Sequence, residues 1–373
     1  MNPFLLRIAA VAIVCLVVGA AVGRFLLAPP PRTIVKRVEV KEKAKFKASD
    51  TVFLKWTMVS AFPGATPQFG TLGKRFTAKL RRASAGTMQI TFAEPGKPIP
   101  AENCFDAVID GKVQACWSSP GYWQSKEKAL VLFSGVPFGP DAREYMAWYY
   151  YGGGRELLEK IYNRHGMKSV LCGVTAPEGG GWFKKEIKSV EDFKGMKIRI
   201  FGLGARVVEK LGATPLRLKG SEVVGALRAG QIAGAEYSIP SIDVNLGLHK
   251  VVKNYYLPGW HKPAALLEFL VSAKAWEELP NPAKGMILNA CGDTLREGFA
   301  QGAAMQPAAI RELRVKGVTI RQYPKEVMDA LKAAWTKVAE EESASNALFK
   351  EVWRSLSSFR TEYRLWNDRS RLR

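Results

Sequence analysis

The stretch AVIDGKVQACW, residues 107–117, is repeated in kind by ALRAGQIAGAE, residues 226–236. Each copy reads as the end of a helix, a glycine turn at Gly111 or Gly230, and a short buried strand. Two similar α/β lobes would explain the repetition, with ligand-binding residues placed just beyond the carboxyl end of each strand. Because helix–glycine–strand units are common in every α/β protein, a chance likeness of the two copies stays open as the alternative.

The sequence around these copies alternates between short apolar strands and amphipathic helices. Residues 52–59 and 88–92 have strand character, and residues 72–82 between them have helical character. This alternation predicts an α/β fold. The chain has 373 residues, of which 47% are hydrophobic and 24% are charged, and a globular chain of this length is expected to divide into two lobes.

The N-terminal segment differs from the remainder. Arg7 precedes an apolar run, residues 8–23, and we expect residues 1–28 to form a signal peptide or an N-terminal anchor. Residues 29–50 begin with three prolines, are rich in lysine and arginine, and form the predicted basic linker. The basic flank opposes export under the positive-inside rule, but the rest of the chain favours a periplasmic protein, with an uncleaved inner-membrane tether as the alternative.

The composition limits the classes of binding partner and the possible states of the cysteines. The formal net charge is +21, which suits nucleic acid, an anionic membrane surface or an anionic ligand. Because no zinc-finger spacing, basic zipper or RNA-binding aromatic motif accompanies this charge, we expect no nucleic-acid binding. Beyond Cys15 there are four cysteines without a CxxC pair, for which three pairings or buried thiols stay open: Cys104, Cys116, Cys172 and Cys291.

The catalytic inventory argues against an enzyme. The histidines are His165, His249 and His261, and the sequence has no HExxH, Walker A or GxSxG motif. Nothing marks a nucleophile beside a base that a third group orients. We therefore predict a binding protein without catalysis. The alternatives are an enzyme of unknown chemistry acting on a small carboxylate and, more weakly, a membrane-anchored scaffold for polyanions.

The segment KIRIFGLG, residues 197–204, predicts a strand that runs into a glycine-rich helix start. Such a turn presents backbone N–H groups and suits an anion. It is not a dinucleotide fingerprint, because the third glycine position holds Val207. Arg199 lies between the apolar residues Ile198 and Ile200, directly before the turn, and this position favours a functional arginine over an ordinary surface one.

Six further stretches carry a family resemblance: VPFG (136–139), WYYYGGG (148–154), GGWFKKEI (180–187), VEDFKGMKIR (190–199), LGLHK (246–250) and YYLPGWH (255–261). In combination they resemble the substrate-binding proteins of tripartite ATP-independent periplasmic (TRAP) transporters, and among these the α-keto acid-binding branch. The resemblance covers the chain from the end of the predicted linker almost to its carboxyl terminus.

The resemblance implies a two-lobed periplasmic binding-protein fold with crossing strands and a long connecting helix. We expect lobe I to comprise residues 51–172 and 265–315, and lobe II to comprise residues 173–264 and 316–373. A small organic acid, a keto or hydroxy monocarboxylate, would bind between the lobes and pass to the membrane permease subunits of a TRAP transporter. Delivery to a sensory system is the alternative.

The resemblance also implies individual site residues. Arg199 corresponds to the arginine with which the family grips the substrate carboxylate, and a planar guanidinium matches a carboxylate through two parallel hydrogen bonds. The segment that contains Trp117, Tyr122 and Trp123 corresponds to a pocket-lining stretch of the first lobe. Aromatic side chains of this kind supply the apolar walls of a small-molecule cleft, and packing in the core is the alternative for part of them.

The branch usually holds a metal ion beside the substrate. By alignment its ligand positions fall on Glu178, where the family has glutamine, on Glu236 with the carbonyl of Tyr237, and on Lys262, where the family has glutamate. A charged lysine has no lone pair for a metal. Glu178, Glu236 and Lys262 together carry the same net charge as the usual set with a monovalent cation. We therefore predict a site without metal or cofactor, with Lys262 as a fixed cation; a solvent-pointing Lys262 is the alternative.

Overall fold

The computed structural model describes residues 52–370, which lie in the unit Ser49–Arg373. The predicted signal peptide or anchor and most of the predicted linker therefore lie outside the described residues. Among the residues described, none of the helices combines the length and apolar character that crossing a membrane requires.

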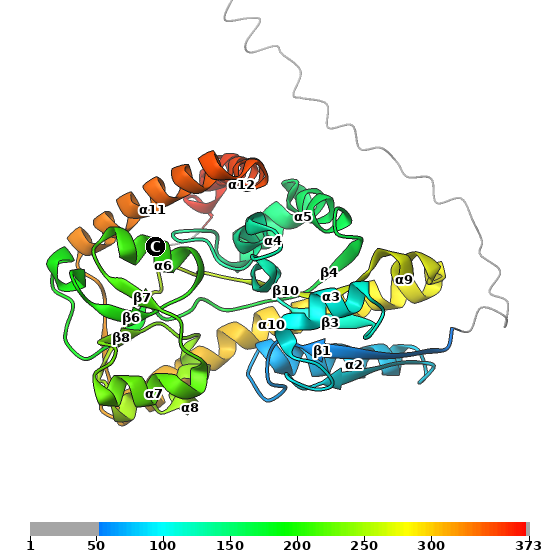
Figure 1. The fold of residues 1–373 in the computed structure, drawn as a ribbon, viewed down its shortest axis with the longest axis horizontal. Helices are drawn as coiled ribbons and strands as arrows, with labels where there is room; N and C mark the ends of the chain where they lie inside the picture. The colour runs from blue at the N-terminus through cyan, green and yellow to red at the C-terminus, as the bar shows by residue number, and fades with distance from the viewer. Residues whose placement is uncertain (1–51, 371–373) are drawn as a thin grey trace, which may run out of the picture. The chain divides into compact units, whose positions relative to one another are not determined.

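The first of two sheets contains both parallel and antiparallel strands (Figure 1). Its strand order is β2(Met88–Ala93), β1(Leu54–Ser60), β3(Ala115–Ser118), β10(Leu266–Ser272) and β4(Met167–Val174). Strand β1 pairs in parallel with β2 and β3, whereas β10 runs antiparallel to β3 and β4. A late segment of the chain thus completes a sheet that early segments begin.

The second sheet is built from shorter strands. Its order is β11(Thr319–Arg321), β9(Asn254–Tyr256), β5(Gly181–Phe183), β8(Gly234–Ala235), β6(Lys197–Arg199) and β7(Thr214–Leu216). Strand β6 pairs in parallel with β7 and β8, and β5 runs antiparallel to β8 and β9. Each sheet forms the centre of one lobe, so the predicted two-lobed α/β fold is confirmed.

The two copies of the repeated pattern lie one in each sheet. Helix α3(Cys104–Ile109) leads through Gly111 to β3, and α7(Gly220–Ala229) leads through Gly230 to β8. Gly111 has φ of 72° and Gly230 has φ of 75°. Residues with a side chain rarely adopt this left-handed backbone, so both turns require glycine.

Helices and single turns cover the sheets. The remaining elements are α2(Phe69–Ala83), η2(Ala101–Asn103), η3(Pro120–Trp123), η4(Lys128–Phe133), α4(Ala142–Tyr151), α5(Gly154–Asn163), η5(Val190–Phe193), α6(Gly202–Lys210), α8(Pro240–Leu246), η6(Leu248–Lys250), α9(Ala273–Glu278), α10(Asn281–Val315), α11(Lys325–Ser345) and α12(Ala347–Asn367). Leu72, Phe76 and Leu80, one helical turn apart on α2, are fully buried, as expected for an amphipathic helix against a sheet.

The long helix α10 spans both lobes. It packs against β4 and α2 of the first lobe and against α8 of the second (Figure 1). The 35-residue helix continues through Pro307. It is the predicted connecting helix.

Two segments between the sheets run side by side. The backbone N–H of Thr175 donates to the carbonyl of Ala265 over 2.9 Å, that of Glu178 to Lys262 over 3.1 Å, and that of Gly180 to Tyr256 over 2.7 Å. The chain passing from β4 to β5 is therefore hydrogen-bonded to the chain passing from β9 to β10. These paired segments, 175–180 and 256–265, connect the two sheets, and we call them the crossover; residues 175–180 and 257–265 lie outside the β-strands.

Two further features qualify the sequence expectations. Helix α11 packs against α6, whereas α12 packs against η4, α4 and α5. The predicted lobe boundaries gave α12 to the second lobe and its three neighbours to the first, and those boundaries stay a prediction. Both cysteine pairs, whose connection the sequence left open, are disulfides: Cys104–Cys116 links α3 to β3, and Cys172–Cys291 links β4 to α10.

Candidate functional site

The candidate site lies where second-sheet strands end beside the crossover. Arg199 is the last residue of β6, and Glu236 directly follows the neighbouring parallel strand β8. The backbone N–H of Glu236 donates to the carbonyl of Arg199 over 2.8 Å. Because parallel strands carry their carboxyl ends to the same edge of a sheet, these two side chains meet there, opposite Glu178, His261 and Lys262 from the crossover.

The Arg199 side chain is buried and held from several sides. Its guanidinium lies over the rings of Phe201 and Tyr237, 4.1 and 4.8 Å from their centroids. One terminal nitrogen lies 3.3 Å from the Glu236 carboxylate and also donates to the Glu236 carbonyl. The Nε atom is buried and has no hydrogen-bond partner among the described residues. An unpaired buried donor is costly, so this edge of the guanidinium is suited to an incoming acceptor.

Five side chains form what we call the ionic cluster: Arg199, Glu236, His261, Glu178 and Lys262. The Nε2 atom of His261 lies 3.2 Å from a Glu178 oxygen and 3.3 Å from a Glu236 oxygen. The Lys262 ammonium lies 3.2 Å from the other Glu178 oxygen. Cations and carboxylates thus alternate from Arg199 through Glu236, His261 and Glu178 to Lys262.

The cluster also sets its own protonation. Burial alone would lower the pKa of His261, but the two neighbouring carboxylates outweigh it and raise that pKa to about 9. Burial likewise opposes charge on Glu236, but His261, Arg199 and Lys262 hold its pKa well below the usual range. The pKa of Lys262 is raised, because Glu178 and Glu236 outweigh the effect of burial. At neutral pH His261 and Lys262 therefore carry a positive charge and Glu236 carries a negative charge.

His261 is a member of the cluster that the sequence does not single out. It is one of three histidines and ends the YYLPGWH stretch. Its side chain is buried, and the Cα of Gly204 at the start of α6 faces it, since a Cβ added there would lie 3.1 Å from the His261 Cβ. The signal that could have found it is its position directly before Lys262.

The aromatic residues expected to line the pocket have contacts within the first lobe. Trp117 is fully buried, stacks on Phe76 and donates its indole N–H to the Phe69 carbonyl. Trp123 is buried and donates to the Ser118 hydroxyl, and Tyr122 is partly exposed. These contacts place both tryptophans in the core of the first lobe.

Tyr237 behaves differently from those three, because its ring lies over the Arg199 guanidinium. Its place directly after Glu236 was the reason for naming it in the sequence. The structure thus brings Arg199, Glu178, Glu236, Tyr237 and Lys262 together. A ligand-binding role for all eight sequence-predicted residues stays a prediction.

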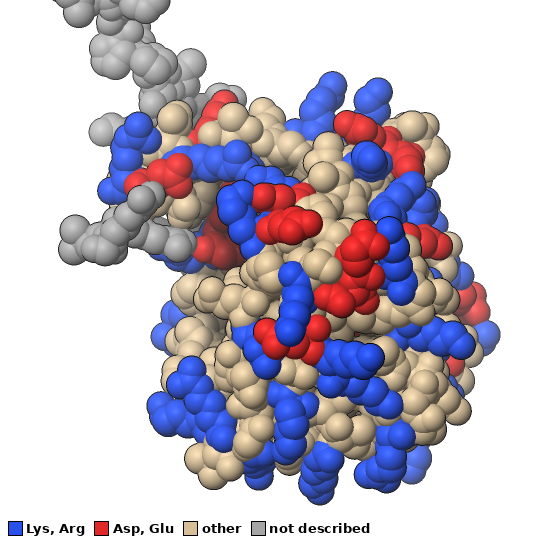
Figure 2. Space-filling view, turned by 90° about the vertical axis from the view of Figure 1, so that its left-hand side faces the viewer, with Lys and Arg blue, Asp and Glu red and all other residues tan. Residues whose placement is uncertain are grey.

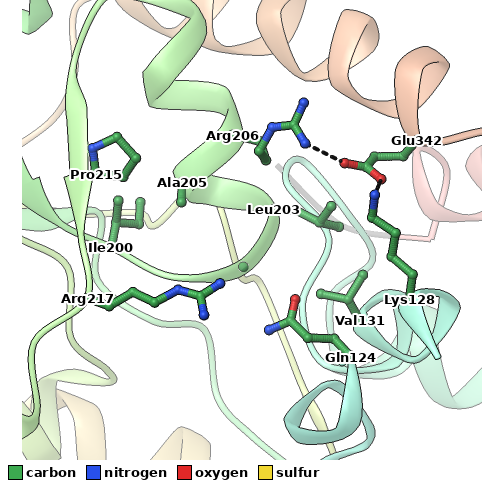
Figure 3. Close-up of a pocket in the computed structure, with 11 residues that line it drawn as sticks. Gln124, Lys128, Val131, Ile200, Leu203, Ala205, Arg206, Pro215, Arg217 and Glu342 are labelled. Atoms are coloured by element: carbon green, nitrogen blue, oxygen red, sulfur yellow. Dashed lines mark hydrogen bonds and ion pairs between the residues drawn. The ribbon is translucent and has the colours of Figure 1, made fainter. Parts of the chain in front are cut away.

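A pocket of about 300 Å³ opens beside the start of α6 (Figure 3). It is lined on one side by Gln124, Lys128 and Val131 and on the other by α6 and its surroundings. Arg217 points into it, and Glu342 of α11 is paired with Arg206 and Lys128 across it, as Figure 3 shows. Ile200, the residue after Arg199, belongs to its lining, so the pocket adjoins the strand that carries the arginine.

Charge on the surrounding surface is distributed rather than gathered into one tract. Figure 2 shows lysine and arginine side chains spread over the visible face, with acidic side chains among them in its middle and upper parts. The lower part of this face carries basic side chains with few acidic ones among them.

Three donor atoms lie close enough together to hold a metal ion. Oxygens of Glu178 and Glu236 and a ring nitrogen of His261 are all within 4.8 Å of one another. However, the Lys262 ammonium lies 3.2 Å from Glu178. A charged ammonium has no lone pair for a metal and would repel a cation at the same carboxylate. The Lys262 position therefore does not fit a metal ion bound at Glu178.

Comparisons with known proteins agree with this architecture. Residues 58–346 match the family model described as bacterial extracellular solute-binding protein, family 7. A monocarboxylate 2-oxoacid-binding periplasmic protein of Nostoc sp. is 35% identical over 315 residues, which cover 84% of this chain and 86% of that protein.

Solved structures are similar as well. A TRAP periplasmic solute-binding protein from Colwellia psychrerythraea, with bound calcium and pyruvate, has a TM-score of 0.81 and 34% identity, covering 85% of this chain and 97% of that one. One from Pseudoalteromonas atlantica, with bound sodium and pyruvate, has a TM-score of 0.79 and 32% identity, covering 84% and 96%. The chain therefore belongs to family 7 of the bacterial extracellular solute-binding proteins and is a TRAP-transporter solute-binding protein.

Proposed function

We propose that this protein binds a small 2-oxo or 2-hydroxy monocarboxylate at the ionic cluster and delivers it to the membrane permease of a TRAP transporter. The observation that carries the proposal is Arg199, whose buried Nε has no partner among the described residues. A carboxylate that approaches this edge of the guanidinium gains a charge-assisted hydrogen bond where water is excluded.

The pairing within the cluster supports one carboxylate and not two. Its three basic side chains already lie against Glu178 and Glu236, and Arg199 Nε is a buried donor without a partner among the described residues. One ligand carboxylate can use this donor, whereas a second would be a buried negative charge without a partner. The Nostoc relative, named for monocarboxylate 2-oxoacids, supports the same class of ligand.

Closure of the two lobes around the acid is part of the proposal, with the crossover and α10 as the connections between them. Binding proteins of two lobes commonly close about a hinge of a few residues. Small-angle scattering with and without a saturating acid should show a smaller radius of gyration in the bound form. Identical profiles would contradict closure.

Calorimetric titration of the purified protein tests the ligand. Pyruvate and lactate are the probes, and methyl pyruvate, which lacks the carboxylate, is the matched control. We expect pyruvate to bind and methyl pyruvate not to, and pyruvate at 100 times its dissociation constant to stabilise the fold by about 2.7 kcal/mol. Equal behaviour of pyruvate and methyl pyruvate would refute a carboxylate site.

The destination of the ligand is tested separately. We place the protein in the periplasm, where it meets the permease. Uptake of labelled pyruvate by cells with and without this chain measures transport. Loss of uptake supports delivery to a permease, and unchanged uptake with a lost response to the acid would favour a sensory role.

A further inference from the structure

We propose that the ammonium group of Lys262 takes the place of the metal ion that accompanies pyruvate in similar proteins, so that this protein binds its acid without metal. The inference rests on the proposed function, because it concerns the same site. The structures from Colwellia psychrerythraea and Pseudoalteromonas atlantica hold calcium or sodium together with pyruvate.

The first argument is that Lys262 is fixed by the residue with which it pairs. Its carbonyl accepts the backbone N–H of Glu178 over 3.1 Å, and its ammonium lies 3.2 Å from the Glu178 carboxylate. Both residues lie on the crossover, so the backbone register itself places the cation beside the carboxylate. A flexible surface lysine has no such constraint.

The second argument is that the first lobe leaves room for the lysine side chain. Gly135 has φ of 143°, and a Cβ added there would lie 2.5 Å from Cγ and 2.9 Å from Cε of Lys262. Any other residue at this position would strain the backbone and collide with the lysine methylenes. The Lys262 side chain is 32% exposed, and its ammonium is paired with Glu178.

Third, the Lys262 ammonium already lies where a cation would be needed. It is 3.2 Å from a Glu178 oxygen and has no lone pair to offer a metal ion. A metal ion bound at the same carboxylate would be a second cation next to the ammonium, and like charges this close repel.

The fourth argument is that Lys262 can still donate to a ligand. An ammonium group has three N–H donors, and one is directed to Glu178. The remaining donors suit the oxo or hydroxyl oxygen beside the acid's carboxylate, the kind of oxygen that a metal ion would otherwise bind. Arg199 and Lys262 would thus divide the two polar groups of the acid between them.

The test compares acid binding with and without metal. The purified full-length protein is dialysed against EDTA into sodium-free buffer, its metal content is measured by mass spectrometry, and pyruvate is titrated in EDTA, in calcium and in sodium. We expect the same affinity in all three conditions, no stoichiometric metal, and no heat when calcium is titrated alone. Pyruvate binding that requires calcium or sodium, or stoichiometric calcium bound by Glu178 and Glu236, would overturn the inference.

Two variants sharpen this test. Lys262→Met keeps the length of the side chain and removes the charge, and should weaken pyruvate binding about tenfold to a hundredfold in EDTA, with partial recovery in sodium. The exposed Lys185→Met is the matched control and should bind as the unaltered protein does. Equal affinities of the Lys262→Met and Lys185→Met proteins in EDTA would overturn the inference, provided that circular dichroism shows both folded.

The double variant Lys262→Glu with Glu178→Gln should make pyruvate binding depend on a metal ion. It should bind calcium directly and should bind pyruvate only when calcium or sodium is present. Metal-independent pyruvate binding by this variant would show that Lys262 does not substitute for a metal. If pyruvate and lactate bind no version of the protein in any buffer, the proposed function fails, which is distinct from binding that merely requires metal.

Discussion

Buried glutamates in the two lobes face opposite surroundings. In the first lobe, Glu268 of β10 accepts hydrogen bonds from the hydroxyls of Ser118 at 3.0 Å, Tyr162 at 2.7 Å and Ser169 at 2.6 Å. These donors are neutral, and burial raises the pKa of Glu268 to about 7. In the second lobe, Glu236 is as deeply buried but lies among cations, and its pKa is well below the usual range.

The difference shows that partner charge, not burial, decides whether a buried carboxyl group is ionised. Asp243 lies in the second lobe, yet its hydrogen-bond partner is the neutral indole of Trp182, and burial raises its pKa to about 7. The contrast therefore depends on whether the partners of a buried carboxyl group are charged, and not on the lobe in which the group lies. A carboxyl group whose pKa lies near neutrality contributes little fixed charge to a ligand, whereas the ionic cluster offers two buried cations, Arg199 and His261.

Removal of Arg199, the cation at one end of the ionic cluster, should have the largest effect on pyruvate binding. Arg199→Ala should weaken pyruvate binding by about 2–5 kcal/mol, because the ligand carboxylate and Glu236 both lose a desolvated partner. Calorimetry measures the affinity, and Arg217→Ala, an exposed arginine directed into the neighbouring pocket, is the matched control. An unchanged affinity in a folded Arg199→Ala protein would show that the ionic cluster is not the carboxylate site.

The neutral surroundings of Glu268 should be detectable in the pH dependence of the free energy of unfolding. A folded pKa of about 7 for Glu268, raised above the unfolded value, means that its contribution to stability is full below about pH 4.5 and is lost as pH rises through 7. The loss amounts to about 3 kcal/mol. Glu268→Gln has no proton to release at this position. Urea unfolding between pH 4 and 8 should therefore show that its free energy of unfolding rises by this amount relative to that of the unaltered protein as pH rises.

Glu236→Gln is the counterpart with the opposite sign. Because the folded pKa of Glu236 is depressed, its charge stabilises the fold above the unfolded pKa, and this contribution disappears as pH falls. The stability of Glu236→Gln should therefore lie below that of the unaltered protein at pH 7 and approach it in acid. The stabilities of the two glutamine variants relative to the unaltered protein should change with pH in opposite directions. If both change in the same direction, the distinction between the surroundings of Glu268 and the ionic cluster is wrong.

Much of this arrangement could be predicted from the sequence, because strand ends are local features. The apolar strand before Arg199 and the helix–glycine–strand pattern before Glu236 indicated where each side chain leaves the second sheet. The family resemblance added Glu178 and Lys262, and the two-lobed fold and connecting helix followed from it. The ionic partners of these residues depend on which segments lie side by side, and a single sequence gives little indication of that.

The residues that sequence reasoning missed or placed elsewhere illustrate this limit. His261 meets Glu178 only because the crossover segments pair, through the hydrogen bond from the Glu178 N–H to the Lys262 carbonyl. For Trp117, strand periodicity shows that neighbouring side chains alternate between two faces, but not which face is covered by a helix. In the structure Trp117 packs against Phe76 of α2.

Glu342 is a further buried carboxylate, whose surroundings are intermediate between those of Glu268 and Glu236. Its substitution should have the smallest effect on pyruvate binding. The Glu342 side chain is 3% exposed and pairs with Arg206 at 3.0 Å and with Lys128, but these cations are themselves 43% and 45% exposed. Its partners are charged, as in the ionic cluster, but water screens them. Lys128 belongs to η4 and Arg206 to α6, so the interaction joins elements that line opposite sides of the pocket (Figure 3).

If this bridge stabilises the closed arrangement, Glu342→Gln should weaken pyruvate binding by about 1 kcal/mol, since partly exposed ion pairs contribute about that much. Glu341→Gln is the control, because Glu341 pairs with the same Arg206 at 3.2 Å from an exposed position. Calorimetry should find Glu341→Gln unchanged and Glu342→Gln weaker. Equal affinities of the two variants would mean that the half-exposed cations Arg206 and Lys128 are not coupled to the ligand.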